Sequence, residues 1–204
     1  FSAGDEPDGS GKFIANVLNN KDIADAIHAL LDRGGLILGI CNGFQALVKS
    51  GLLPYGRLGM VTKDSPTLFR NDINRHISQI VTTRVGTTNS PWLSGFAVGD
   101  LHTIAVSHGE GKFVVNEEFA RELFANGQVA FQYVDPLEEE PTMESPYNPN
   151  GSYYAIEGII SKNGQILGKM GHTERFEGNL FKNIIDEGLE QPLFDNAVAY
   201  FRGE

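Results

Sequence analysis

The only cysteine of the chain, Cys41, stands in the pentapeptide GICNG, between Gly39 and Gly43. The apolar residues 36–40 predict a buried strand, and the residues after the cysteine are typical of a helix. Gly-x-nucleophile-x-Gly at such a junction indicates a nucleophile elbow, whose tight turn we expect to exclude side chains at both glycines. The helix N-terminus would favour the thiolate, and the Asn42 N–H would stabilise an oxyanion. We therefore predict a catalytic nucleophile at Cys41, the alternative being a buried apolar cysteine.

A cysteine nucleophile needs a base, and the base needs a group that orients it. His172 follows a predicted strand, and Glu174 comes two residues later. In an extended segment these two side chains point the same way, so the carboxylate would orient the imidazole. His108, in the motif SHGEG, either lines a pocket or belongs to a turn that needs Gly109 and Gly111. His28 is expected to be a half-buried residue of the first helix, and His76 and His102 have no evident acidic partner.

The elements before and after Cys41 predict an α/β fold. Residues 12–33 carry apolar side chains at helical spacing, most clearly in their second half. The buried strand of residues 36–40 and a helix ending near Gly51 come next. Helix, buried strand, tight turn and helix in this order favour a parallel sheet, whose strands bind ligands at their carboxyl ends.

The rest of the chain is richer in β-structure. Strands are predicted in residues 75–85, 102–115 and 128–135. A short helix is expected in residues 116–126, an exposed loop in residues 136–152 and a closing helix in residues 178–201. Residues 155–172 predict a hairpin with a two-residue turn at Asn163-Gly164.

Composition limits the class of protein. The 204 residues fit one large domain, and 41% hydrophobic with 21% charged residues is typical of a globular protein. The sequence has no apolar run long enough for a membrane span and no secretory signal pattern. A single cysteine forms no internal disulfide, which favours a reducing compartment and a cytoplasmic location. The formal net charge of -10 argues against a nucleic-acid partner.

Five motifs in chain order resemble those of a known family. They are FSAGD (1–5), GICNGFQ (39–45), SHGEG (107–111), NPNGS (148–152) and GHTER (171–175). Together they resemble the glutaminase domains of phosphoribosylformylglycinamidine synthases, which are class I glutamine amidotransferases. The resemblance covers nearly the whole chain. It implies a flavodoxin-like three-layer α/β sandwich with a mostly parallel central sheet. Residues 1–204 would form one glutaminase domain without the strand–helix–strand segment that precedes FSAGD in the family.

The resemblance also implies a reaction. Cys41 would attack the side-chain amide of glutamine, His172 would act as base and then as acid, and Glu174 would orient His172. Hydrolysis of the thioester would give glutamate. The ammonia would serve the ATP-dependent conversion of formylglycinamide ribonucleotide to its amidine in de novo purine biosynthesis. The residues expected around glutamine are Asn42, Gln45, His108, Gly109 and Glu110.

The implied partner is a synthetase, as a further domain of the same polypeptide, which we favour, or as a separate subunit. ATP and magnesium would belong to that partner. No metal or cofactor is expected in this domain, because GDEPDGSGK lacks the spacing of a phosphate-binding loop. The acidic residues 138–140 would be a solvated surface or a docking site for the partner.

One departure from the family lies at the catalytic histidine. The family carries a proline on each side of it, and here Gly171 and Thr173 stand there, which we expect to loosen the loop without removing a proton-transfer group. The alternatives are a class I glutaminase that serves another synthetase, and a hydrolase of the same fold that acts on peptides or small aldehydes. A third is a non-catalytic interaction domain.

Overall fold

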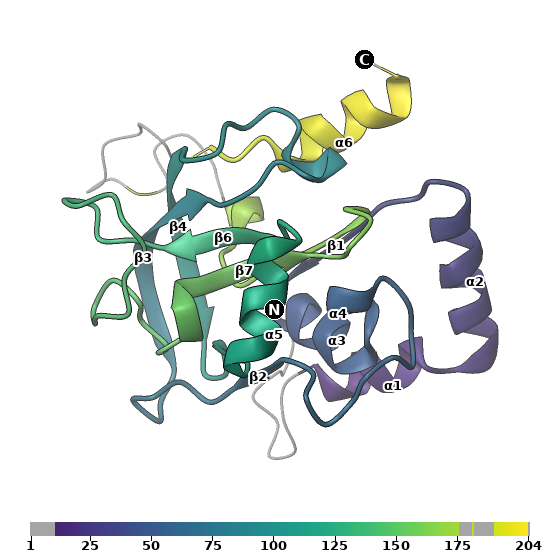
Figure 1. The fold of residues 1–204 in the computed structure, drawn as a ribbon, viewed down its shortest axis with the longest axis horizontal. Helices are drawn as coiled ribbons and strands as arrows, with labels where there is room; N and C mark the ends of the chain where they lie inside the picture. Colours follow the sequence, from purple (N-terminus) through teal and green to yellow (C-terminus); the bar gives the residue numbers. More distant parts are fainter. Residues whose placement is uncertain (1–10, 176–180, 182–189, 204) are drawn as a thin grey trace.

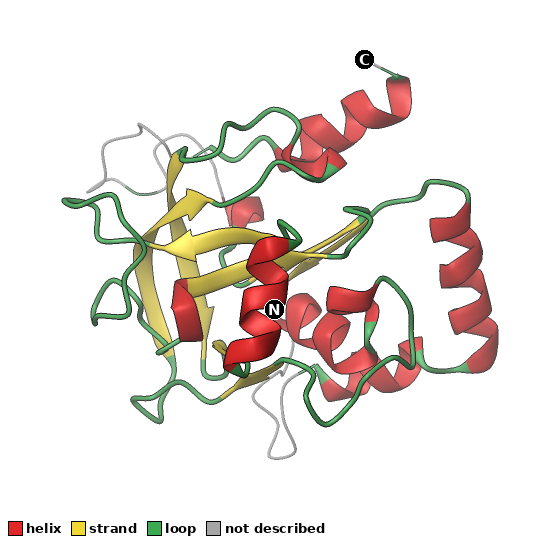
Figure 2. Cartoon of the chain, viewed as in Figure 1, coloured by secondary structure: helices red, strands yellow, loops and turns green. Residues whose placement is uncertain are grey.

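The computed structural model describes residues 11–175, 181 and 190–203, and these form a sheet with helices on both faces (Figures 1 and 2). The FSAGD motif and much of the predicted closing helix lie outside the described residues. The main sheet has the strand order β1 (Ile37–Ile40), β8 (Ile166–Lys169), β7 (Ile156–Ile160), β6 (Val129–Tyr133), β3 (Ile77–Val85) and β4 (Leu101–His108). A second, two-stranded sheet pairs β2 (Thr67–Phe69) with β5 (Lys112–Val114).

The α/β class is confirmed, but the expectation of a mostly parallel sheet is wrong for the described part of the chain. β1 runs parallel to β8, with Ile40 opposite Lys169. Every other neighbouring pair of the six-stranded sheet is antiparallel. The short connection between β7 and β8 requires an antiparallel pair there, because a parallel pair needs a long crossover. β1 lies at an edge, so it is half-buried rather than fully buried as predicted.

The predicted helices are present with adjusted ends. The first segment divides into two helices, because Asn20 caps the second one by accepting a hydrogen bond from the Asp22 N–H. The helices are α1 (Lys12–Leu18), α2 (Lys21–Asp32), α3 (Asn42–Ser50), α4 (Leu52–Tyr55), α5 (Glu117–Ala125) and α6 (Leu193–Arg202). Three 3-10 turns precede or follow strands, η1 (Pro91–Leu93), η2 (Tyr153–Ala155) and η3 (Thr173–Arg175).

Each face of the sheet has its own apolar core. On one face, Phe44 of α3 and Leu123 of α5 pack in a cluster with Ile166 of β8. On the other, Leu167 packs with residues of η1 and α6. Adjacent residues of β8 thus serve opposite faces, as the alternation of a strand requires. The two cores make the three layers of the predicted sandwich (Figure 1).

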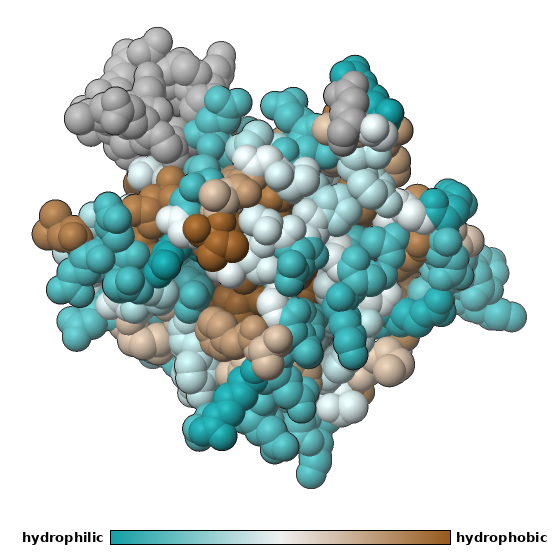
Figure 3. Space-filling model, turned by 45° about the horizontal axis from the view of Figure 1, so that its top comes forward, coloured by the Kyte–Doolittle hydropathy of each residue, from teal (hydrophilic) through white to brown (hydrophobic). Residues whose placement is uncertain are grey.

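The surface carries no helix suited to a bilayer among the described residues, since none is both long and apolar enough to cross one. Large apolar side chains are exposed at scattered positions, and they form separate brown patches in Figure 3. Scattered exposed apolar groups are normal for a protein surface.

The hairpin of β7 and β8 is confirmed, but its connection is longer than predicted. The Ser161 N–H donates to the Ile166 carbonyl, which leaves residues 162–165 as a four-residue loop rather than a two-residue turn. Gly164 adopts a φ of 74° within this loop, a conformation that glycine accepts without strain.

The two glycines of the elbow have different roles. A Cβ on Gly39 would collide with the Leu47 side chain and would lie 2.8 Å from the carbonyl carbon of Gly43, so β1 meets α3 only because Gly39 has no side chain. A Cβ on Gly43 would meet no described atom within 4 Å. Among the described residues, the expectation that both glycines are sterically required is therefore wrong for Gly43, because none of them lies where its Cβ would be.

This difference predicts opposite effects of two alanine substitutions. Gly39→Ala should lower the free energy of unfolding by about 1–3 kcal/mol, because the strand and helix must separate. Gly43→Ala should leave it unchanged or raise it by up to about 1 kcal/mol, since alanine is a better helix former. Urea denaturation of the two variants measures both values. Equal destabilisation would contradict the packing that we describe.

Candidate active site

Cys41 and His172 follow the two strands that pair in parallel. The Cys41 N–H donates to the Lys169 carbonyl at 2.8 Å, which extends the β1–β8 ladder beyond the end of β1. Both residues also contact β4. The Cys41 thiol lies 3.6 Å from the Ser107 carbonyl, and the His172 N–H donates to the Ala105 carbonyl at 2.8 Å. The structure therefore brings the predicted nucleophile and base to one edge of the sheet.

The backbone of Cys41 has the strain of a nucleophile elbow. Its φ of 54° and ψ of -108° lie in a region that residues with a side chain rarely adopt. Such outliers persist only where the surroundings enforce them, and they cluster at functional sites. α3 begins at the next residue, Asn42, so the thiol stands at a helix N-terminus. This geometry matches the predicted strand–turn–helix junction.

His172 and Glu174 are in direct contact. The His172 Nδ1 lies 2.5 Å from the Glu174 Oε1. The prediction assumed an extended segment, and that reason is wrong, because Glu174 lies in the 3-10 turn η3. The turn still lets the carboxylate reach back to the ring. The His172 Nε2 is buried and makes no hydrogen bond to any described residue, which leaves this nitrogen open to a reacting group.

Glu174 is charged at neutral pH. Partial burial opposes ionisation, but the hydrogen bond with His172 and the nearby charge of Arg175 favour it more strongly. The net effect holds the pKa of the Glu174 carboxyl below its usual value. The side chain is 44% exposed, so solvent screens part of this interaction.

The SHGEG turn is held by a buried asparagine that the sequence did not point to. Asn71 Nδ2 donates to the His108 carbonyl at 2.8 Å, and the Asn71 N–H donates to the Gly109 carbonyl at 3.0 Å. Asn71 Oδ1 lies 3.1 Å from His108 Nδ1 and accepts from the Gly111 N–H. The His108 ring packs where a Cβ on Gly111 would lie, so that glycine is required. His108 is consequently buried at 3% exposure.

Two more expected pocket residues contact each other. Gln45 is buried on α3, and its Nε2 donates to the backbone carbonyl of Glu110. Gln45 thus ties α3 to the SHGEG turn. Asn42 and Glu110 are half-buried beside it. The turn therefore has a fixed position relative to Cys41.

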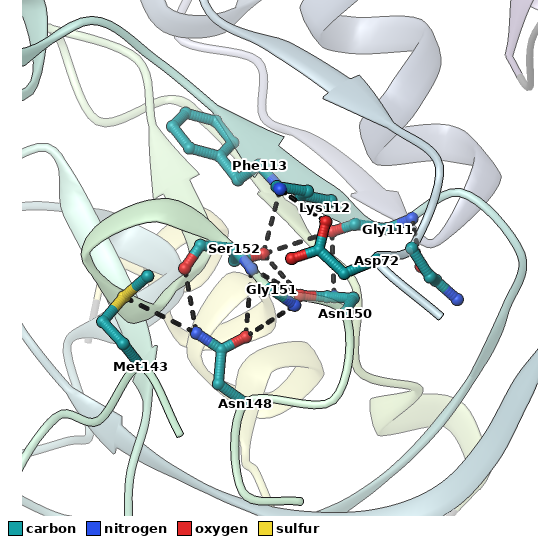
Figure 4. A network of polar contacts seen from close by, with 10 residues as sticks. Asp72, Gly111, Lys112, Phe113, Met143, Asn148, Asn150, Gly151 and Ser152 are labelled. Carbon is teal, nitrogen blue, oxygen red and sulfur yellow. Dashed lines mark hydrogen bonds and ion pairs between the residues drawn. The ribbon is translucent and has the colours of Figure 1, made fainter. Parts of the chain in front are cut away.

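The NPNGS motif forms a second support for this turn (Figure 4). Asn150 Nδ2 donates to the Gly111 carbonyl at 2.9 Å and lies 3.1 Å from the Tyr133 hydroxyl. Ser152 Oγ accepts from the Phe113 N–H at 3.0 Å. Asn148, Asn150 and Ser152 are buried, so the prediction that residues 136–152 form an exposed loop is wrong for its last residues. Their polar side chains bind the backbone groups that a neighbouring strand would bind in a sheet.

A buried ion pair lies under the histidine loop, and sequence reasoning missed it. Lys169 of β8 and Glu157 of β7 both have fully buried side chains, and Nζ lies 3.7 Å from Oε1. Burial lowers the pKa of Lys169 despite the charges of Glu157 and Glu174 nearby. The sequence signal for this pair was one glutamate and one lysine within otherwise apolar strands, because such residues are seldom buried without a partner.

A pocket of about 270 Å³ opens beside the Glu174 carboxylate and extends to Gln191, Phe194 and Asp195. It explains how solvent reaches Glu174 while His172 stays buried. The residues that the structure describes contain no group of three or more histidine, cysteine or acidic side chains able to hold a metal ion.

Comparisons with known proteins agree on one family. The family described as "CobB/CobQ-like glutamine amidotransferase domain" matches residues 1–201. The phosphoribosylformylglycinamidine synthase subunit PurQ of Gloeobacter violaceus is 36% identical over 177 residues, which cover 87% of this chain and 70% of that protein. A PurQ subunit of Methanococcus maripaludis is 36% identical over 217 residues, which cover 98% of this chain and 78% of that protein.

A solved structure has the same fold. The structure of PurLQS from Thermotoga maritima contains a chain that superposes with a TM-score of 0.64 at 26% identity, covering 92% of this chain and 71% of that one. The chain described here thus belongs to the family of CobB/CobQ-like glutamine amidotransferase domains, which includes the PurQ subunits of phosphoribosylformylglycinamidine synthase.

Proposed function

We propose that this chain is the glutaminase component of a phosphoribosylformylglycinamidine synthase and that Cys41, His172 and Glu174 carry its chemistry. The observation that supports this most is the strained elbow cysteine at the end of β1, beside the strand that leads to the half-buried His172–Glu174 pair. The family of the chain is a glutamine amidotransferase family, which favours glutamine over a peptide or an aldehyde as the substrate.

The first half of the reaction forms a thioester. The Cys41 sulfur attacks the side-chain amide carbon of glutamine, and the His172 Nε2 takes the thiol proton. The tetrahedral oxyanion accepts a hydrogen bond from the Asn42 N–H at the start of α3. Collapse breaks the carbon–nitrogen bond, and His172 returns the proton to the leaving nitrogen, which departs as ammonia.

The second half regenerates the thiol. His172 takes a proton from a water molecule, which attacks the thioester carbon. The carbon–sulfur bond breaks, glutamate leaves, and the sulfur recovers the proton. Glu174 stays ionised throughout, holding the His172 Nδ1–H and stabilising the imidazolium, as its lowered pKa favours.

Glutamine itself would be held by the SHGEG turn. We assign its backbone and the side chains of His108 and Glu110 to the amino-acid end of glutamine, with Gly109 giving the turn its shape and Gln45 fixing the turn to α3. Preformed backbone groups suit this task, because they lose no conformational freedom when glutamine binds.

The ammonia would pass to a synthetase partner, as a domain of the same polypeptide or as a separate subunit. The relatives are PurQ subunits of phosphoribosylformylglycinamidine synthase, and the similar solved structure is that of PurLQS from Thermotoga maritima. ATP and magnesium would act in that partner, and no cofactor is assigned to this chain. We place the protein in the cytoplasm, since its single cysteine suits a reducing compartment.

Removal of the nucleophile provides the main test. In the assembled synthase, Cys41→Ala should abolish amidine formation with glutamine and leave it unchanged with added ammonia, because only ammonia production needs the thiol. Steady-state assays with each nitrogen source measure this. Full activity of the variant with glutamine would show that another residue is the nucleophile.

The proposed roles also predict an order among variants of the other two residues. His172→Ala should lower glutamine-dependent kcat by about 10²–10⁴-fold, because it removes the base and the acid. Glu174→Ala should lower it less, because water can take over part of the orienting role. A larger loss for Glu174→Ala than for His172→Ala would contradict the assignment.

The lowered pKa of Glu174 predicts how the pairing depends on pH. An acid whose pKa is lowered on folding stabilises the folded state above its unfolded value, near about 4.3, and this contribution is lost as pH falls through the folded value. The stability difference between the native chain and Glu174→Gln should therefore shrink as pH falls below about 5. Urea denaturation between about pH 6 and about pH 3 measures it, and a difference that stays constant as pH falls through this range would contradict the prediction.

A further inference from the structure

We propose that the buried Lys169–Glu157 ion pair is a positioning device that holds the His172 loop by its backbone. This proposal rests on the proposed role of His172 as the catalytic base. Neither charged residue would touch glutamine. Both would act through Gly171 and Thr173, the residues on either side of His172.

The pair is not explained by stability. Both side chains are fully buried, with Nζ and Oε1 3.7 Å apart, and Nζ also lies 5.2 Å from the centroid of the Phe131 ring. Removing two charges from water is costly, and two apolar side chains of the same size are often as stabilising or more so. A fully buried ion pair therefore calls for a role that apolar side chains cannot fill.

The contacts of the pair indicate that role. Glu157 Oε1 accepts from the Gly171 N–H at 2.5 Å, and Lys169 Nζ donates to the Gly171 carbonyl at 3.0 Å. Both backbone polar groups of this glycine are thus bound by charged side chains. Lys169 Nζ also donates to Thr173 Oγ1 at 3.2 Å, and that hydroxyl donates to Gln191 Oε1. Hydrogen bonds to charged groups are stronger and more directional than neutral ones.

Gly171 is the residue most in need of such a restraint. Glycine has the widest backbone freedom of all residues, and this one directly precedes the base. A Cβ at this position would lie 2.9 Å from both Glu157 Oε1 and Ile104 Cγ2, so no larger residue fits without rearrangement. The two charges restrain the backbone that the glycine would otherwise leave free. A base displaced by about 1 Å loses on the order of 10²-fold in rate.

Two double variants separate positioning from stability. Lys169→Met with Glu157→Gln and Lys169→Met with Glu157→Leu are both neutral and similar in volume, but only glutamine keeps an acceptor for the Gly171 N–H. Glutamine-dependent kcat in the assembled synthase should fall in the order native, Met/Gln, Met/Leu, with about a tenfold to hundredfold loss for the last. The KM for glutamine and the ammonia-dependent rate should change less than about twofold.

Thermal unfolding of the same proteins is measured alongside, and kcat is compared at temperatures at which every variant is fully folded. The Met/Leu variant should unfold no higher than Met/Gln, because it leaves the buried Gly171 N–H without an acceptor. Lys162→Met, at an exposed lysine of the same hairpin, is the matched control and should behave as native in every assay. Native kcat in both double variants, or a kcat loss that disappears at temperatures at which the variants are fully folded, would overturn the proposal.

Thr173→Val provides a second test of the proposal if the double variants do not fold. It removes only the hydroxyl that accepts from Lys169, and it should lower kcat by about threefold to tenfold with KM unchanged. An unchanged kcat would overturn the proposal.

Failure of the proposed function and failure of the positioning role give different results. Glutamine-dependent activity of Cys41→Ala or His172→Ala would overturn the proposed function itself. If both are inactive while the Met/Leu variant keeps native kcat, only the positioning role is lost.

Discussion

β1 and β8 run parallel, and their ladder continues beyond Ile40, where the Cys41 N–H donates to the Lys169 carbonyl. Parallel strands end at the same edge of a sheet, so one loop begins with Cys41 and the neighbouring loop carries His172. β4 contacts both residues at these strand ends, since the Ala105 carbonyl accepts from the His172 N–H and the Ser107 carbonyl lies beside the Cys41 thiol. The rest of the site is arranged around this edge, because the elbow fixes one reacting group and every other loop must meet it.

Buried polar side chains fix the loops that gather there. A loop has no neighbouring strand to satisfy its backbone groups, and a buried loop must find other partners for them. Asn71 and Asn150 provide these partners for the SHGEG turn, and Lys169 and Glu157 provide them for the histidine loop. Such side chains are costly to bury but directional, so they set loop positions that apolar packing would leave loose.

The same principle explains why Gly171 and Thr173 are compatible with an ordered histidine loop. Prolines restrict a loop by limiting their own φ angles, whereas here the restriction comes from hydrogen bonds to neighbouring strands. A proline at position 171 would have no N–H to donate to the Glu157 carboxylate. Side chains from β7 and β8 thus restrain the residues where the prolines are absent, which argues against the expected loosening of the loop.

The sequence alone determined the elbow at Cys41, the alternation of helices and strands around it, and the candidate base and its carboxylate, since each depends on neighbouring residues. The contact between His172 and Glu174 was predicted correctly, but from an extended geometry that the chain does not adopt. Only the tertiary structure decided the mixed direction of the sheet, the burial of NPNGS and the contacts of Asn71, Glu157 and Lys169. These depend on residues distant in the chain, and a lone buried lysine or asparagine has no local pattern that reveals its partner.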